Sequence, residues 1–286
     1  MIDTIKKDAL DFIKYDKEYE EYLKTLNKIS QISKDNINFY IISNGEIVID
    51  DKIKSNLDRI HKFANNFNMI FNIYLILSPF KKTFNKDLNK PLSIININSA
   101  YTYLTNNQSI KIICCIRKEE YVKCIYHEII HHIPLIHKSF KKENIIKLKK
   151  HFKILNEKID PNEAIIEFWA LVMFLKELSN NDDNKYYELF KEELKYSLFK
   201  CYQINKLQNF YGGYWKDNET NLYCYIIFKT IIMYNLDIFM NIYTFPYDDD
   251  KITDFLINYS KLPIVKSNNK KRKLMSLCFM VNSDLF

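Results

Sequence analysis

Two histidines and a glutamate near the middle of the chain have the spacing of a hydrolytic metal site. Residues 127–131 read His-Glu-Ile-Ile-His, so His127 and His131 project from one face of a helix and can share one metal ion. Glu128 follows the first histidine, where it can take a proton from a metal-bound water. The flanking residues are mostly apolar, and burying these polar groups without partners would be costly. The pattern therefore predicts a zinc site rather than two incidental histidines.

A later pair of glutamates offers the third protein ligand that such a zinc site needs. Glu163 and Glu167 are four residues apart in an otherwise apolar segment that begins after Pro161, a favoured residue for the first turn of a helix. Two carboxylates that face a core repel each other unless a cation lies beside them. A zinc ion bound by two histidines supplies that charge.

The two motifs, H-E-x-x-H followed by N-E-x-x-x-E, resemble those of the thermolysin-like metallopeptidases, the gluzincins. The resemblance implies that His127, His131 and Glu163 bind zinc and that Glu128 is the general base. It also implies that Glu167 orients the first histidine, although this chain has Glu rather than Asp there.

The resemblance covers roughly residues 94–170. In gluzincins the edge of a strand before the motif helix pairs with the peptide substrate. Residues 94–104 or 109–116 are the candidates for that strand in this chain.

Gluzincins also place a histidine or tyrosine from a later helix against the oxyanion that forms during amide hydrolysis. No histidine follows His151, so a tyrosine must take this role if the site is active. Tyr225 is the first choice, followed by Tyr223 and Tyr214. The preceding pair Gly212–Gly213 either lets the backbone pass close to the substrate or is simply a turn.

The elements that must position these residues follow from the hydrophobic periodicity. Residues 4–33 have helical spacing and predict one or two helices. Residues 37–50 predict a β-hairpin that turns at Asn44-Gly45, and residues 51–66 return to helical spacing. Three further segments predict strands: 68–78, 92–104 and 109–116.

After Arg117 the apolar spacing becomes helical, and six helices are expected: 118–137, 141–158, 162–178, 184–208, 219–234 and 251–260. This layout predicts an α+β fold. Residues 1–117 would form an N-terminal α/β lobe with a mixed or antiparallel sheet and the substrate-side edge strand. Residues 118–286 would form a helical lobe that carries both zinc motifs, and the two lobes would make one catalytic unit.

The composition excludes several classes of function. With three glycines in 286 residues, the chain contains neither a phosphate-binding Walker loop nor a dinucleotide fingerprint. The net charge of +7 permits a polyanionic partner, but the lysines alternate with acids, as on solvated helix faces. Nucleic-acid binding is therefore disfavoured. The basic block Lys266–Lys273 is expected to be exposed, with a nuclear-import signal as the less favoured interpretation.

The six cysteines show no C-x-x-C pair and no disulfide-framework spacing, which indicates a reducing compartment. No secretory signal is visible at the N-terminus, and no apolar stretch is long enough to span a membrane. We therefore expect a cytosolic protein. Many residues of the chain are of types with AT-rich codons, such as Ile, Lys, Asn, Tyr and Phe. This composition, together with a strand followed by an HExxH motif, also resembles uncharacterised metallopeptidase-like proteins of large DNA viruses. A viral origin would place the protein in the host cytoplasm.

Together, these features predict a zinc metallopeptidase that hydrolyses peptide bonds of a peptide or protein substrate. His132 and His137 are assigned to the helix surface or to the core rather than to the metal. The alternative is a catalytically inactive, metallopeptidase-like binding protein in which zinc has a structural role.

Overall fold

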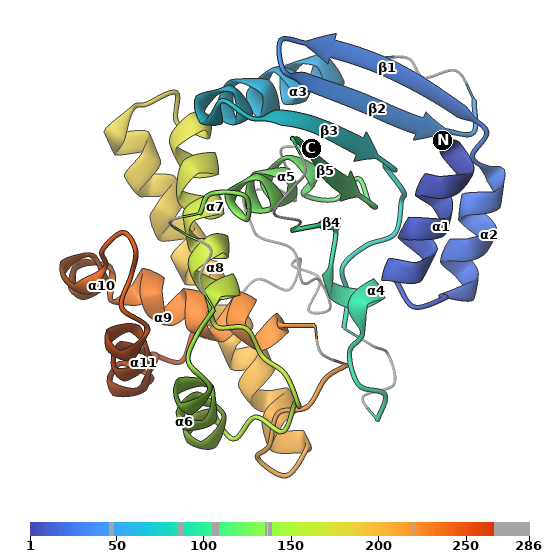
Figure 1. Cartoon of the computed structure of the whole chain (residues 1–286). Helices are drawn as coiled ribbons and strands as arrows, with labels where there is room; N and C mark the ends of the chain where they lie inside the picture. Colours follow the sequence, from blue (N-terminus) through green and yellow to red (C-terminus); the bar gives the residue numbers. More distant parts are fainter. Residues whose placement is uncertain are drawn as a thin grey trace. The chain divides into compact units, whose positions relative to one another are not determined.

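The structure, a computed structural model, describes residues 1–45, 49–84, 89–104, 109–134, 136, 139–218 and 220–265 (Figure 1). The chain divides into two compact units. Among the described residues, unit 1 consists of residues 1–82 and 94–133, and unit 2 of residues 83–93 and 134–265.

Unit 1 is built on a five-stranded mixed sheet with the strand order β1-β2-β3-β5-β4. The strands are β1 (Lys28–Lys34), β2 (Ile37–Ser43), β3 (Ile70–Leu75), β4 (Ala100–Thr102) and β5 (Ile110–Cys115). The three central strands are parallel, whereas β1 and β4 run antiparallel to their neighbours. The short strand β4 therefore forms one edge of this sheet, beside β5.

Alternation of side chains along the strands gives the sheet two apolar faces. Phe39, Ile73 and Ile113 lie in register on one face, where α5 packs, and α3 packs against α5. On the opposite face, Ile42 and Cys114 form a cluster with α1 and α2. The helices of this unit are α1 (Ile2–Phe12), α2 (Lys17–Thr25), α3 (Asp51–Ala64), the short α4 (Ile94–Ile97) and α5 (Tyr121–Ile130).

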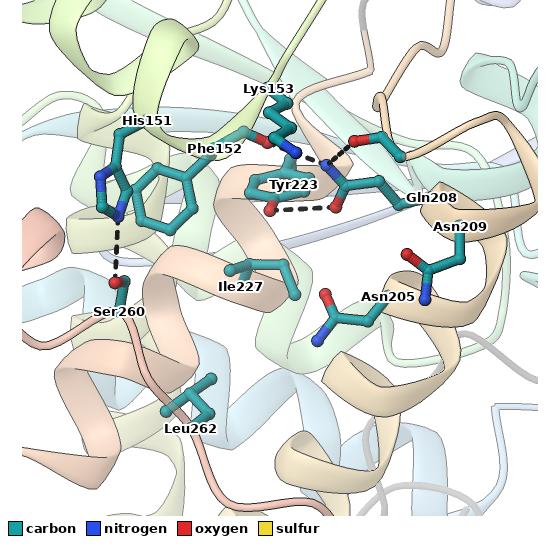
Figure 2. Close-up of a pocket in the computed structure, with 11 residues that line it drawn as sticks. His151, Phe152, Lys153, Asn205, Gln208, Asn209, Tyr223, Ile227, Ser260 and Leu262 are labelled. Carbon is teal, nitrogen blue, oxygen red and sulfur yellow. Dashed lines mark hydrogen bonds between the residues drawn. The ribbon is translucent and has the colours of Figure 1, made fainter.

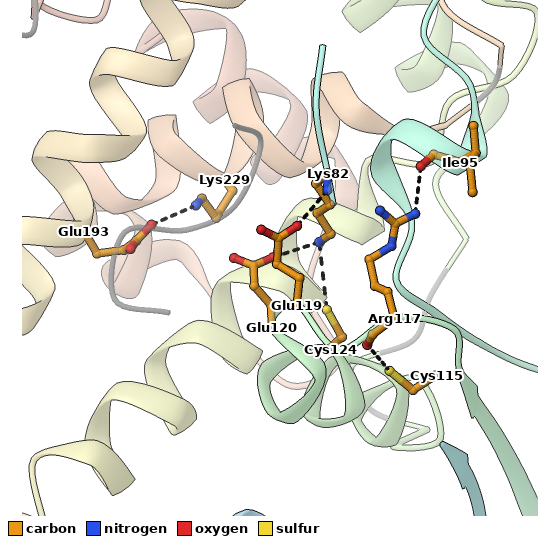
Figure 3. A network of polar contacts seen from close by, with 9 residues as sticks. All are labelled: Lys82, Ile95, Cys115, Arg117, Glu119, Glu120, Cys124, Glu193 and Lys229. Carbon is orange, nitrogen blue, oxygen red and sulfur yellow. Dashed lines mark hydrogen bonds and ion pairs between the residues drawn. The ribbon is translucent and has the colours of Figure 1, made fainter. Parts of the chain in front are cut away.

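Unit 2 is helical in the part of it that the structure describes. Its core helix α7 packs against α8, α9 and the π-helical segment η2, and most of its residues are buried, as expected for a helix that is apolar on nearly all sides. A buried ion pair joins α8 to α9, with Glu193 Oε1 3.9 Å from Lys229 Nζ (Figure 3). The elements are α6 (Lys142–Phe152), α7 (Asn162–Leu178), α8 (Asp183–Phe210), η2 (Cys224–Phe228), α9 (Lys229–Tyr234), α10 (Leu236–Ile242) and α11 (Asp249–Asn258).

The predicted α+β class is confirmed, but several local predictions differ from the structure. The segment 4–33 is helical only as far as Thr25, and Lys28–Lys34 is strand β1. The hairpin partner of β2 is this earlier strand, joined through Asp35, which adopts the left-handed conformation with φ 52°. In the second arm of the hairpin expected at Asn44-Gly45, residues 46–48 lie outside the described residues, and Ile49 and Asp50 are not part of a strand.

Segment 92–104 also differs from the single strand that was expected. It contains the one-turn helix α4 and then the three residues of β4. The boundary between the units also falls later than Arg117, because α5 packs against α3, β4 and β5 of unit 1. The helix that carries HExxH thus belongs with the sheet.

Among the described residues, no single helix combines the length and apolar composition needed to cross a membrane. The segments Cys224–Tyr234 and Leu236–Ile242 meet those criteria only as a pair, and they are bent by 93° relative to each other.

Candidate metal centre

Helix α5, which carries the HExxH motif, is buried along its whole length in unit 1. Its N-terminus is held by Lys82, whose Nζ lies 2.9 Å from Glu120 Oε2 and 3.9 Å from Cys124 Sγ (Figure 3). The backbone N–H of Lys82 donates to Glu119 Oε2 at 2.7 Å. Removing one partner of such a buried pair is strongly destabilising, so these contacts fix where the helix begins.

The two motif histidines, His127 in α5 and His131 at its C-cap, face each other as their spacing predicted. His127 Nε2 and His131 Nε2 lie 3.1 Å apart, and the side chains are only 6% and 9% exposed. Two imidazole nitrogens that bind one tetrahedral zinc at 2.0–2.1 Å are separated by about 3.3 Å. The pair therefore fits the geometry of two ligands on one ion.

Glu128 is the third polar residue of the motif and is 7% exposed. Its carboxylate follows His127 on the same buried helix. A buried carboxylate at this position can accept a proton from a water held near the two imidazoles. Unit 1 thus carries the three motif residues on one buried helix and its C-cap.

Unit 2 contributes the second motif at the beginning of α7. Asp160 precedes this helix, and its Oδ1 accepts from the backbone N–H of Asn162 at 3.0 Å, while its carbonyl accepts from the N–H of Glu163 at 3.1 Å. The buried Asn162 side chain accepts a hydrogen bond of 2.7 Å from the Tyr247 hydroxyl. This first turn is therefore fixed from both sides.

The two glutamates of α7 differ in burial. Glu163 is half-buried, whereas Glu167, one turn later, is 3% exposed. Their spacing places both on one face of the helix, as predicted. Asp160 is a third carboxylate at this helix start, and its only signal in the sequence is its place before Pro161.

The first-choice tyrosine, Tyr225, lies in the π-helical segment η2, which packs against α7. Its backbone N–H donates to Asn221 O at 3.0 Å, and Asn221 Oδ1 accepts from the Asp160 N–H at 3.0 Å. Burial raises the pKa of the neighbouring Cys224 thiol well above its usual range, and the carboxylates of Asp160 and Glu163 add to the effect. Tyr225 thus belongs to the same corner of unit 2 as the second motif, and π-helical turns are frequent at functional sites.

The second-choice tyrosine, Tyr223, has a different environment. It is 4% exposed, and its hydroxyl donates to Gln208 Oε1 at 3.4 Å. It lines a pocket of about 330 Å³ with Phe152 and Ile227 (Figure 2). Burial raises the pKa of Tyr223, so its proton stays on this hydroxyl.

The remaining sequence candidates are explained by local structure. Tyr214 is 48% exposed. Gly212 and Gly213 have φ of 74° and 88° and end α8, with their N–H groups donating to Asn209 O and Gln208 O. A Cβ atom at either glycine would meet nothing within 4 Å, so the turn requires glycine for its backbone conformation rather than for space. His132 is buried and hydrogen-bonded, and His137 lies outside the described residues.

No protein-family model matches this chain, and comparisons with curated proteins and with solved structures give no match either. We therefore infer the function from the residues of the two motifs and from their surroundings within each unit.

Proposed function

We propose that the chain is a zinc-dependent metallopeptidase that hydrolyses peptide bonds, with Glu128 as the general base. The observation that carries the proposal is the pair of buried imidazoles whose Nε2 atoms lie 3.1 Å apart on α5. Glu163 is the candidate third ligand, because it occupies the position of the first glutamate in the N-E-x-x-x-E motif. Two histidines and one glutamate are also the donor set of a catalytic zinc with an open fourth position.

Each residue then has a distinct role. When bound, zinc lowers the pKa of water and polarises a carbonyl group. Glu128 accepts the proton that the attacking water loses and passes it to the leaving amine. Glu167 orients the first motif histidine, His127, and fixes its tautomer. The peptide pairs with the edge strand β4, so that its backbone direction is set by the sheet.

The assignment of these roles is tested by a peptide-library cleavage profile of the purified protein. Metal-free protein is expected to leave every peptide intact, and addition of one equivalent of zinc is expected to restore cleavage at a defined subset of bonds. A profile that is the same with and without zinc would contradict the proposal. The positions of the cut bonds would also distinguish an endopeptidase from an exopeptidase.

Tyr225 is proposed to donate a hydrogen bond to the oxyanion. Tyr225→Phe removes only the hydroxyl, so kcat is expected to fall by about 10²–10³-fold, while KM and zinc content stay near the wild-type values. The matched control is Tyr223→Phe, which removes a hydroxyl already bonded to Gln208 and should leave kcat nearly unchanged. The reverse result, a large loss only in Tyr223→Phe, would assign the donor to Tyr223 instead.

We further propose that the protein works in a reducing compartment such as the cytosol. The described cysteines are all free and buried: Cys114, Cys115, Cys124, Cys201 and Cys224. Burial raises the pKa of both Cys114 and Cys201 to about 12. Since the thiolate is the reactive form, these thiols are protected as long as the chain is folded.

The burial of these cysteines predicts that their thiols react with a disulfide reagent only after unfolding. In a Cys278→Ser variant, which leaves only the five described cysteines, a disulfide reagent at pH 8 is expected to label almost no thiol in the native state and all five after unfolding in urea. Rapid labelling of native protein would contradict the burial.

The same pKa shifts set the sign of the pH dependence of stability. A folded-state pKa raised to about 12 means that the folded chain keeps protons which the unfolded chain loses above about pH 8.5. The contribution of these two thiols to the free energy of unfolding is therefore fully present below about pH 8.5 and declines as the pH rises toward 12. Urea unfolding at pH 8 and pH 10 should show lower stability at the higher pH.

A further inference from the structure

The residue after the second motif histidine, His132, is hydrogen-bonded to the edge strand of the sheet. Its Nε2 lies 2.7 Å from Oγ1 of Thr102, the last residue of β4. Thr102 Oγ1 lies 2.6 Å from the carbonyl oxygen of Ile112 in β5. Because a carbonyl oxygen only accepts, the hydroxyl donates to Ile112, and the Nε2–H of His132 donates to the hydroxyl. A chain of hydrogen bonds thus runs from the end of the motif helix to two strands.

The position of His132 is itself well defined within unit 1. Its N–H donates to Ile129 O at 3.0 Å, and the N–H of Ile133 donates to Ile130 O at 2.9 Å, so the backbone tightens directly after the motif. The ring meets Phe71 of β3 edge-on, with 6.0 Å between the ring centroids. Its side chain is 9% exposed, and the ring therefore has little freedom to turn away from Thr102.

The strand that His132 contacts is weakly fixed by its own ladder. Only Ala100, Tyr101 and Thr102 pair with β5, and no strand lies on the outer side of β4 among the described residues. So short an edge strand has few backbone hydrogen bonds to hold its register. The side chain of Thr102, placed between His132 and Ile112, supplies an additional anchor at the end of β4.

We propose that His132 is a positioning residue that sets β4 against the helix carrying His127, Glu128 and His131. This inference rests on the proposed function, because β4 is the strand with which a peptide would pair. A bound peptide would take its position from β4, whereas the general base and the histidine ligands take theirs from α5. The hydrogen bond between His132 and Thr102 connects β4 to the end of α5. Breaking it displaces the scissile carbonyl relative to Glu128, and a displacement of about 1 Å can cost about 10²-fold in rate.

Three single variants test this role by steady-state kinetics. His132→Ala and Thr102→Val each break the bond, and each is expected to lower kcat by about 10²-fold, with a smaller change in KM and about one zinc per chain retained. His132→Gln places an amide nitrogen as far along the side chain as Nε2 and is expected to recover most of kcat. The double variant His132→Ala/Thr102→Val should be no slower than either single variant, because both remove the same interaction.

The matched control is His151→Ala in unit 2, which removes another histidine whose Nε2 is paired with a hydroxyl, that of Ser260 at 3.0 Å. It is expected to leave kcat unchanged. An active wild type with His132→Ala at full kcat would overturn the positioning role and leave the proposed function standing. Loss of zinc from folded His132→Ala, or failure of His132→Gln to recover activity, would also overturn it. A wild type without zinc-dependent cleavage would overturn the proposed function and the positioning role together.

Discussion

Peptide cleavage by the Glu128→Gln variant is expected to be slower than wild-type cleavage by about 10²–10⁴-fold in kcat, with zinc content unchanged. Glutamine has nearly the size of glutamate and can occupy the same buried position on α5, where Glu128 is 7% exposed. It cannot accept the proton that the attacking water must lose. The loss should therefore appear in kcat, while the two histidines continue to bind metal.

The matched control for this variant is Glu143→Gln, which neutralises an exposed glutamate in the first turn of α6. Its cleavage rate should equal that of the wild type. The same pair of variants separates the enzyme from the alternative of a structural zinc. A protein in which zinc only stabilises the fold would show no measurable change in Glu128→Gln, whereas His131→Ala, which removes a ligand of that zinc, would unfold the protein.

Removal of a metal ligand is expected to have the second large effect. His131→Ala leaves a single imidazole on α5, and zinc content should fall from about one per chain to nearly zero. Cleavage should disappear with the metal. Because a ligand that binds only the folded state stabilises it, the wild type should unfold at a lower temperature after chelation, and His131→Ala should show no such shift.

Glu163→Ala tests whether unit 2 supplies the third ligand. Loss of the carboxylate is expected to weaken zinc binding strongly, so that the metal is removed by a chelator concentration that the wild type withstands. His151→Ala and Glu143→Ala are the matched controls, because neither residue belongs to the proposed site. Wild-type zinc affinity in Glu163→Ala would mean that another group completes the coordination.

The motif helices were predictable because their sequence signals are local. The spacing of His127 and His131 depends only on helix geometry, and their Nε2 atoms do face each other at 3.1 Å. The helix predicted at 162–178 is α7, with the same bounds, because an apolar run after Pro161 has few competing conformations. These elements required no information about distant parts of the chain.

Features that depend on pairing between distant segments were not predictable in the same way. Strand β1 contains lysine, serine and glutamine and has little strand character of its own, yet pairing with β2 makes it a strand. The assignment of α5 to unit 1 likewise depends on its packing against α3 and the sheet. The bond between His132 and Thr102 joins residues 30 positions apart, and neither residue type signals it.

The sequence alone also could not decide which tyrosine is the candidate oxyanion donor. Composition and position left Tyr225, Tyr223 and Tyr214 as candidates. The structure separates them by environment, since Tyr223 is buried against Gln208, whereas Tyr225 is half-buried in η2, beside α7. The π-helical turn that carries Tyr225 has no recognisable sequence signature, so its geometry could only come from the fold.

Metal analysis of the purified wild-type protein, combined with a thermal unfolding measurement before and after chelation, tests the zinc assignment most directly. The purified protein is predicted to contain about one zinc per chain. A strong chelator should remove this zinc and lower the unfolding temperature, and added zinc should restore both the metal content and the unfolding temperature. A correctly folded protein that contains no metal, binds none when zinc is supplied and unfolds at the same temperature in chelator would contradict it.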